Sequence, residues 1–270
     1  MTVKNFFNGL KVIIIFIILF FLSEMAAVSA VSIYFKYSNQ GILWEEFVKN
    51  NSPTLTFIVQ ILRLIIIALF IYFRKNKFYE KYKEDYIYDR KTRNGEFSNI
   101  LLLSIGILGF STFLTLILSL FPVFIDSINS LNNSFESFYN FQLLGFLSIV
   151  VAAPLMEELA LRAILFRELE VNFGVVASHI ISALIFAILH FNLIQAAYAF
   201  LAGLFLSLIY KKSQSIEKVI FIHLLNNLIS FMMSNFQDQA KIFLPFALIL
   251  YIYSAYYLIK YLKGPSDDND

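Results

Sequence analysis

Residues 141–169 read FQLLGFLSIVVAAPLMEELALRAILFREL, a long apolar run with charged side chains gathered near its middle. A helix needs about 20 mostly apolar residues to cross a hydrocarbon core about 30 Å thick. Lipid offers the backbone no hydrogen-bond partner, so a run of this kind is expected to be helical throughout. The stretch therefore predicts a membrane-spanning helix that carries ionisable groups into the bilayer.

The rest of the chain repeats this apolar pattern. Of its 270 residues 59% are hydrophobic, and the mean hydropathy is +0.72. No long segment alternates apolar and polar residues with period two, so a barrel of strands is disfavoured. We expect an all-α fold, a polytopic membrane helix bundle with about eight transmembrane helices. The predicted spans are 10–35, 54–73, 98–125, 141–169, 173–190, 193–210, 216–234 and 242–262.

Composition excludes several classes of protein. The formal net charge is only +2, without the concentrated basic face of a nucleic-acid-binding protein, so no nucleic-acid partner is expected. The chain has no cysteine, which excludes disulfides, thiolate metal sites and a cysteine nucleophile. The expected partners are the lipid bilayer and a peptide or protein substrate. Oligomeric state cannot be read from these patterns.

Lysine and arginine predict the orientation of the spans. Eight of them lie in the segment 74–94, and the segment 123–140 has none. The basic segment 74–94 is therefore expected in the cytoplasm. With eight spans, both termini then lie in the cytoplasm as well, and the loops at 36–53 and 126–140 face outward. The composition is rich in Ile, Lys, Asn and Phe, which favours a bacterial cell membrane. Lys4, Lys11 and an Ala-x-Ala-like site ending at Ala30 leave a cleaved signal peptide as an alternative for the first span.

We divide the chain into two regions on this basis. Residues 1–97 form an N-terminal two-span region with a basic cytoplasmic loop. Residues 98–264 form a membrane core, and the polar motifs within it lie in 141–234. The tail 265–270 is expected to be a short disordered end.

Three ionisable side chains lie close together in the fourth span. Such groups are costly inside a membrane, so they are functional candidates by default. Glu158 and Arg162 are four residues apart and therefore share one helix face, where they can pair. Glu157 is rotated by about 100° and has no such partner within the helix. One glutamate is thus held by an arginine, and the other is left to act on a substrate.

Two of the three histidines lie in apolar spans. His190 ends the fifth span, and His223 lies in the seventh, one turn before Asn227. A rise of 1.5 Å per residue places Glu157 and His190 at similar depth on an antiparallel hairpin, but places His223 about 10 Å nearer the cytoplasm. Helix tilt or a buried turn would have to close that gap. Together these groups suit attack of water on a carbonyl, with a carboxylate as general base.

These motifs resemble a known family. Glu157-Glu158-x-x-x-Arg162, Phe186-x-x-x-His190 and His223-x-x-x-Asn227 occur in order, each in a predicted span. The pattern is similar to the CAAX-protease and bacteriocin-processing family of intramembrane endopeptidases, also called the Abi family. It covers about residues 141–234. Leu161 and Ala163 depart from it, because the family has an aromatic residue before the arginine and a glycine after it.

The resemblance implies a role for each matching residue. Glu157 would activate water, His190 and His223 would be catalytic, and Asn227 would stabilise the oxyanion. Glu158 and Arg162 would orient the site. Zinc or another divalent metal, held by Glu157, His190 and His223, is one possible cofactor. A metal-free glutamate mechanism is the other, and the resemblance does not decide between them.

Three further polar features are interpreted as structural. His179 is expected at the cytoplasmic interface, away from catalysis. Arg63, in the middle of the second span, is expected to pair with an acid such as Glu24 or to extend its charged end to the membrane surface. Ala199, Gly203 and Ser207 form a line of small residues suited to helix packing.

The leading functional hypothesis is an intramembrane endopeptidase that cuts a membrane-associated or secreted peptide. One alternative is a non-enzymatic membrane scaffold or immunity protein with the same fold. Another is a proton-coupled transporter, because buried Glu and His also suit proton relays. The lack of an internal repeat argues against the transporter. Prenylated C-terminal peptides, bacteriocin leaders and signalling-peptide precursors all remain candidate substrates.

Overall fold

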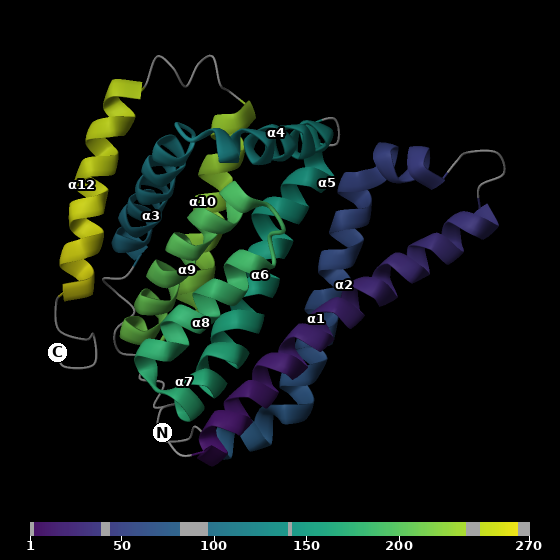
Figure 1. Cartoon of the computed structure of the whole chain (residues 1–270), viewed down its shortest axis with the longest axis horizontal. Coiled ribbons are helices and arrows are strands. Elements are labelled where there is room, and N and C mark those ends of the chain that lie inside the picture. Colours follow the sequence, from purple (N-terminus) through teal and green to yellow (C-terminus); the bar gives the residue numbers. More distant parts are fainter. Residues whose placement is uncertain (1–2, 39–43, 82–96, 140–141, 236–243, 264–270) are drawn as a thin grey trace.

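The computed structural model describes residues 3–38, 44–81, 97–139, 142–235 and 244–263. Within these ranges the chain is helical almost throughout and has no strand, and its helices form a bundle (Figure 1). Six of the described helices are long and apolar enough to cross a membrane. Seven helices lie outside the fourth predicted span and coincide with the other predicted spans: α1 (Val3–Ser38), α2 (Trp44–Lys81), α3 (Phe97–Leu118), α8 (Val175–Ile188), α9 (Leu193–Ser213), α10 (Ile216–Asn235) and α12 (Leu244–Lys263).

Each of the eight predicted spans coincides with helical structure, which confirms the all-α membrane bundle. Seven of them are the helices just named. α8 has only 14 residues and is the shortest. The start of α1 and the end of α12 lie at the same end of the bundle as the turn between α7 and α8 (Figure 1).

The fourth span is one long helix of five consecutive segments. These are α5 (Gln142–Phe146), η3 (Leu147–Ala152), α6 (Ala153–Glu158), η4 (Leu159–Phe166) and α7 (Arg167–Phe173). η3 and η4 are π-helical. Pro154 is the second residue of α6 within this continuous helix, so the helix passes through a residue that has no N–H to donate. π-helical turns are rare and occur often at functional sites, and here they flank the two glutamates on both sides.

The core of the bundle lies between α3, α9, α10 and α12. Leu103 and Ile107 from α3 meet Leu206 and Ile222 there, and all four side chains are fully buried. A second cluster packs the fourth span against α8 through Leu161, Leu165 and Phe186. The small-residue line on α9 packs as predicted, because a Cβ added at Gly203 would lie only 3.0 Å from the Phe186 ring.

α1 and α2 lie beside this core. α1 runs obliquely in Figure 1, with its N-terminal part beside α7, and places Val12, Ile13 and Phe16 against the second cluster. Arg63 of α2 forms an ion pair with Glu24 of α1, which confirms the predicted pairing. The guanidinium also lies 4.0 Å from the centre of the Phe20 ring. The N-terminal hairpin is therefore tied together by a charge pair at membrane depth.

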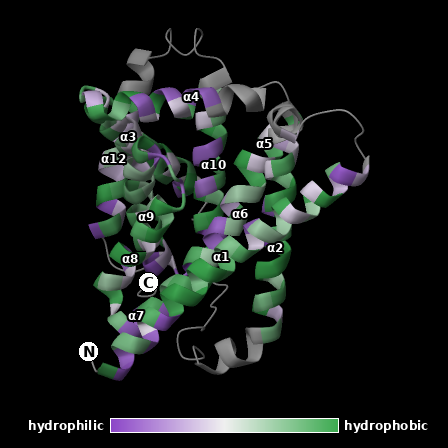
Figure 2. Cartoon of the chain, turned by 45° about the vertical axis from the view of Figure 1, so that its right-hand side comes forward, coloured by the Kyte–Doolittle hydropathy of each residue, from purple (hydrophilic) through white to green (hydrophobic). Residues whose placement is uncertain are grey.

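Two segments that we expected to be outward loops are largely helical instead. Residues 126–140 are almost entirely within α4 (Ile125–Tyr139), and much of 36–53 belongs to the ends of α1 and α2. α4 lies across one end of the bundle (Figure 1), and Figure 2 shows hydrophilic colour along it. We expected a loop because Ser and Asn have weak helix propensity. Ile125, Ile128 and Leu131 are nevertheless spaced so that they lie on one face of a helix.

Several predictions concern residues outside the described ranges. The basic segment 74–94 continues α2 as far as Lys81, and the remainder of it is not described. The tail 265–270 also lies outside the described residues. The orientation of the termini, a cleaved first span and the division at residue 97 stay predictions.

Close packing of α3 on α12 gives a stability test. A Cβ added at Gly106 would lie 2.7 Å from the backbone oxygen of Ser254, so a larger residue there must push the helices apart. We expect Gly106→Val to destabilise the protein by roughly 1–3 kcal/mol, the usual cost of overpacking. Thermal unfolding in detergent measures this. Leu116→Ala, at a side chain of α3 that is 62% exposed, is the control and should unfold near the temperature of the unaltered protein.

Candidate active site

The two adjacent glutamates of α6 have different surroundings. The Glu158 side chain is fully buried, and its Oε2 lies 3.2 Å from Nε of Arg162. The carboxylate oxygen and the N–H group are not aligned for a hydrogen bond, so this contact is an ion pair only. The Glu157 side chain is 21% exposed and does not share this arginine contact. The predicted i,i+4 pair is therefore confirmed, and of the two carboxylates only that of Glu158 contacts Arg162.

His223 of α10 lies between the two carboxylates. Its Nδ1 is 2.7 Å from Oε1 of Glu158, and its Nε2 is 3.7 Å from Oε2 of Glu157. An ionised carboxylate can only accept, so Nδ1–H donates to Glu158. In the neutral imidazole this leaves the Nε2 lone pair directed to the side of Glu157. Glu158 therefore fixes the ring orientation of His223.

Arg162 is anchored by two other helices. Its Nη2 donates to the backbone oxygen of Gly203 in α9 at 3.1 Å. Its guanidinium carbon also lies 5.2 Å from the centre of the Phe186 ring in α8. The arginine side chain is fully buried, so three helices surround it. Because an isolated buried charge is very costly, these contacts and Glu158 explain how it is tolerated.

Phe186 connects the two histidines. Its ring meets His190 edge-on with centroids 4.8 Å apart, and it meets His223 edge-on at 5.8 Å. His190 lies in the turn after α8, where its Nδ1 is 2.8 Å from the backbone oxygen of Phe186. The aromatic residue of the motif therefore positions both imidazoles by contact.

Asn227 joins the site to the fourth span. Its Nδ2 donates to the backbone oxygen of Ile149, within the π-helical η3, at 2.9 Å. An amide nitrogen has two donor hydrogens, so one remains to bind a ligand. The neighbouring Asn226 is buried, and its Oδ1 accepts no hydrogen bond from the described residues. The sequence did not single out Asn226.

The depth mismatch expected for His223 does not keep it from the site. Its Nε2 lies 3.7 Å from Oε2 of Glu157, so the two side chains reach the same level of the bundle. A buried turn is not the reason, because Gln214 and Ser215 between α9 and α10 are partly exposed and Glu217 is exposed.

The candidate metal ligands are only partly brought together. Glu157 and His223 are adjacent, whereas the contacts of His190 are with the ring and the backbone oxygen of Phe186. Across the described part of the chain, no three histidine or acidic side chains are grouped closely enough to hold a metal ion. As arranged in this structure, the residues do not fit the predicted three-ligand site, and we derive no step through a metal.

His179 is buried among protein side chains, and its predicted position at the cytoplasmic interface stays a prediction. It is only 9% exposed, its Nδ1 lies 2.8 Å from Oγ of Ser207, and its ring packs 4.9 Å from that of Phe166. The small hydroxyl on α9 gives the imidazole a polar partner inside the bundle. These contacts hold α8, α9 and the fourth span together, which is a packing role.

Two residues near Glu157 were not assigned to the site from sequence. Arg63 of α2 and Tyr198 of α9 both interact electrostatically with the Glu157 carboxylate. Arg63 had been recognised only as an intramembrane charge. Nothing in the sequence around Tyr198 distinguishes it from the other tyrosines of the chain.

Removing Arg162 tests the buried charge pair. In Arg162→Met the Glu158 carboxylate keeps only His223, so we expect a loss of about 3–5 kcal/mol, as for other broken buried pairs. Adding Glu158→Gln to Arg162→Met should recover part of this stability, because the uncompensated charge is then gone. Thermal unfolding of the single and double variants in detergent measures both effects. Equal unfolding temperatures for all of them would contradict the pairing.

Comparison with known proteins agrees with this geometry. Residues 139–229 match the family model described as type II CAAX prenyl endopeptidase Rce1-like. The match covers about a third of the chain and contains every motif described above. No curated protein and no solved structure matches. The resemblance inferred from the three motifs is therefore confirmed: this membrane-embedded segment is similar to the type II CAAX prenyl endopeptidases, a family of intramembrane proteases.

Proposed function

We propose that the protein is an intramembrane endopeptidase in which Glu157 activates the attacking water. The observation that supports this most is the position of His223 between the two glutamates. Oε2 of Glu157 and Nε2 of His223 are 3.7 Å apart. A water oxygen can therefore lie about 2.8 Å from both atoms at once, within hydrogen-bond range. The broader assignment of the protein to the membrane proteases is supported by the family match.

The chemistry follows from these positions. Glu157 takes a proton from the water while the oxygen attacks the scissile carbonyl, and the C–N bond breaks when the same proton passes to the leaving nitrogen. The remaining amide hydrogen of Asn227, together with His190, is suited to stabilise the oxyanion. Glu158 and Arg162 hold His223 in place and touch no reacting atom. Glu157, with part of its side chain exposed, is the carboxylate accessible to water.

Replacing the general base tests the proposal. We expect Glu157→Gln to lower the cleavage rate by at least about a hundredfold, the usual contribution of a general base, without changing the unfolding temperature. Purified protein and quenched fluorescent peptides would measure this. Glu170→Gln is the matched control, because Glu170 lies on the same long helix but pairs with Lys211 at 2.6 Å, and it should retain full activity.

Comparing cells that carry the unaltered protein with cells that carry Glu157→Gln identifies natural substrates. Membrane peptides from cells that carry the unaltered protein should include cleaved products that are missing with Glu157→Gln. If both chains give the same peptides and the same phenotype, the protein is a scaffold and the proposal fails. If the unaltered protein drives solute flux in liposomes and cleaves nothing, the transporter alternative holds.

Chelation tests whether a metal is needed. The described histidine and acidic side chains form no three-ligand group, so we expect cleavage to persist after prolonged treatment with a strong chelator. Elemental analysis of the treated protein would verify that metal has been removed. Loss of activity on chelation and its return with zinc would show that the ligands rearrange around an ion.

A further inference from the structure

The turn between α8 and α9 contains a strained residue beside His190. α8 ends at Ile188, α9 begins at Leu193, and Phe191 in the turn has a φ of 51°. This left-handed backbone conformation is rare for a bulky aromatic residue, because the Cβ atom lies too close to the following carbonyl oxygen. Such a conformation persists only where neighbouring groups hold it in place. The contacts of this turn therefore decide how firmly His190 is held.

α4 supplies such contacts through one residue, Ser127. Its Oγ donates a hydrogen bond to Oδ1 of Asn192 at 2.8 Å, and its backbone oxygen accepts one from Nδ2 of Asn192 at 2.8 Å. The same Oγ accepts a hydrogen bond from the backbone N–H of Ile194 at 3.0 Å. We call these three hydrogen bonds the Ser127 clamp. They connect α4 to the residues that directly follow Phe191.

Asn192 is fixed in a second way. It is the N-cap of α9, where its Oδ1 also accepts a hydrogen bond from the backbone N–H of Gln195 at 3.0 Å. On the other side of Phe191, the backbone N–H of His190 donates to a backbone oxygen of α8 at 3.2 Å. Phe191 thus connects two segments that are each held by hydrogen bonds, and its positive φ is the geometry that joins them.

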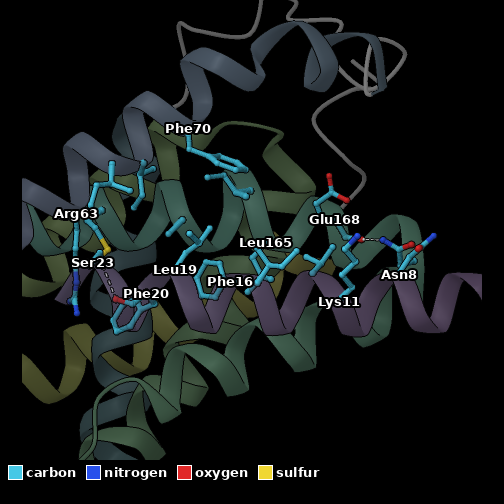
Figure 3. A pocket seen from close by; sticks show the side chains of 18 residues that line it. Asn8, Lys11, Phe16, Leu19, Phe20, Ser23, Arg63, Phe70, Leu165 and Glu168 are labelled. Carbon is cyan, nitrogen blue, oxygen red and sulfur yellow. Dashed lines mark hydrogen bonds between the residues drawn. The ribbon is translucent and has the colours of Figure 1, made fainter. Parts of the chain in front are cut away.

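The contact of α1 with this turn is between exposed rings. The centroids of Phe21 and Phe191 lie 6.1 Å apart, and Phe191 is 71% exposed. The neighbouring Leu19, Phe20 and Ser23 line the cavity between α1, α2 and the fourth span instead (Figure 3). A ring contact at the surface places little constraint on the backbone of Phe191, whereas the Ser127 clamp acts on the next residue directly.

The backbone of the turn determines where the imidazole of His190 lies. Nδ1 of His190 is 2.8 Å from the backbone oxygen of Phe186, which can only accept, so Nδ1–H is the donor. The start of α9 is held by the buried Ile194, whereas Ile188 at the end of α8 is 58% exposed. Relaxation of Phe191 to a negative φ would therefore displace the end of α8, where His190 lies, and break its contacts with Phe186.

Resting on the endopeptidase function above, we propose that Ser127 is a positioning residue for His190. The Ser127 clamp holds Phe191 in its left-handed conformation and thereby keeps the imidazole against Phe186, where it is suited to act on the oxyanion. α4 also contacts α5, the first segment of the fourth span. The same helix therefore connects the turn that carries His190 with the helix that carries Glu157.

NMR of the three histidines reports the position of His190 without requiring catalysis. The sample is full-length protein in detergent with isotope-labelled histidine, and Ser127→Ala removes the hydroxyl of the clamp. We expect the imidazole signals of His190 to shift and those of His179 to stay unchanged, since His179 is bound to Ser207 inside the bundle. Asn129→Ala, at an exposed side chain of α4, is the matched control and should change no histidine signal.

Asn192→Asp tests the clamp from its other side. Aspartate keeps the acceptor oxygen for Ser127 and for the N-cap of α9, but it lacks the amide N–H that donates to the backbone of Ser127. This variant should also shift the His190 signals, and it decides the question if Ser127→Ala does not fold.

Kinetics test the positioning role in the active protein. We expect Ser127→Ala to lower kcat by about tenfold to a hundredfold, the effect of moving a catalytic group by about 1 Å. KM should stay within about twofold, because His190 acts on a charge that develops only in the transition state. If Ser127 only stabilised the fold, the unfolding temperature would fall while kcat and the His190 signals stayed unchanged, and that result overturns the proposal.

Two substitutions at Phe191 test whether the clamp acts through the strained turn. Glycine adopts a positive φ without cost, whereas alanine retains the strain, and both lack the ring. In protein that also carries Ser127→Ala, we expect Phe191→Gly to give a kcat about tenfold higher than Phe191→Ala. With Ser127 intact, the two should agree within about twofold, because the clamp then imposes the conformation. Equal kcat of the two double variants overturns this route.

The assignment of Ser127 and the endopeptidase function fail by different results. His190 signals that stay unchanged in Ser127→Ala and in Asn192→Asp overturn the assignment of Ser127, whatever the protein cleaves. Lack of cleavage by the unaltered protein would instead refute the endopeptidase, and the histidine signals would still report whether the clamp holds His190.

Discussion

The structure depends on one buried interaction, the contact of Glu158 with Arg162 and His223. Both members of the ion pair are fully buried, where an uncompensated charge is not tolerated. Arg162 is therefore held from three helices, and His223 is drawn in as the second partner of the carboxylate. α8, α9 and α10 surround the fourth span and supply contacts to these two charged side chains. The orientation of the candidate catalytic groups follows from that requirement.

The asymmetry between the two glutamates has a chemical consequence. Glu158 contacts both Arg162 and His223, whereas Glu157 lies near the other nitrogen of the same imidazole and is partly exposed. One carboxylate organises the site and its neighbour is accessible to a water molecule. π-helical turns lie on both sides of the two glutamates. A π-helical turn contains more residues than an α-helical turn, so it changes the directions in which the side chains of this helix point.

Much of this arrangement could be predicted from sequence, and the failures have physical reasons. Long apolar runs located the spans, and the spacing of Glu158 and Arg162 gave their pairing, because both depend on local periodicity. The Arg63–Glu24 pair was foreseen from the cost of a lone charge in lipid. α4 was missed since its Ser and Asn residues resemble a loop. The contact of His179 with Ser207 was not predicted, because a hydroxyl on another helix cannot be found by counting residues from a turn. The contact of Gly203 with Arg162 depends on tertiary packing alone.

The fourth span presents two faces with different surroundings. Glu158 and Arg162 point into the bundle, while Met156, Ala160 and Ile164 line an apolar cavity against α1 and α2. Substitutions on the second face can change how the N-terminal hairpin packs and leave the charged network untouched. The hairpin is therefore able to vary in sequence independently of the groups around His223.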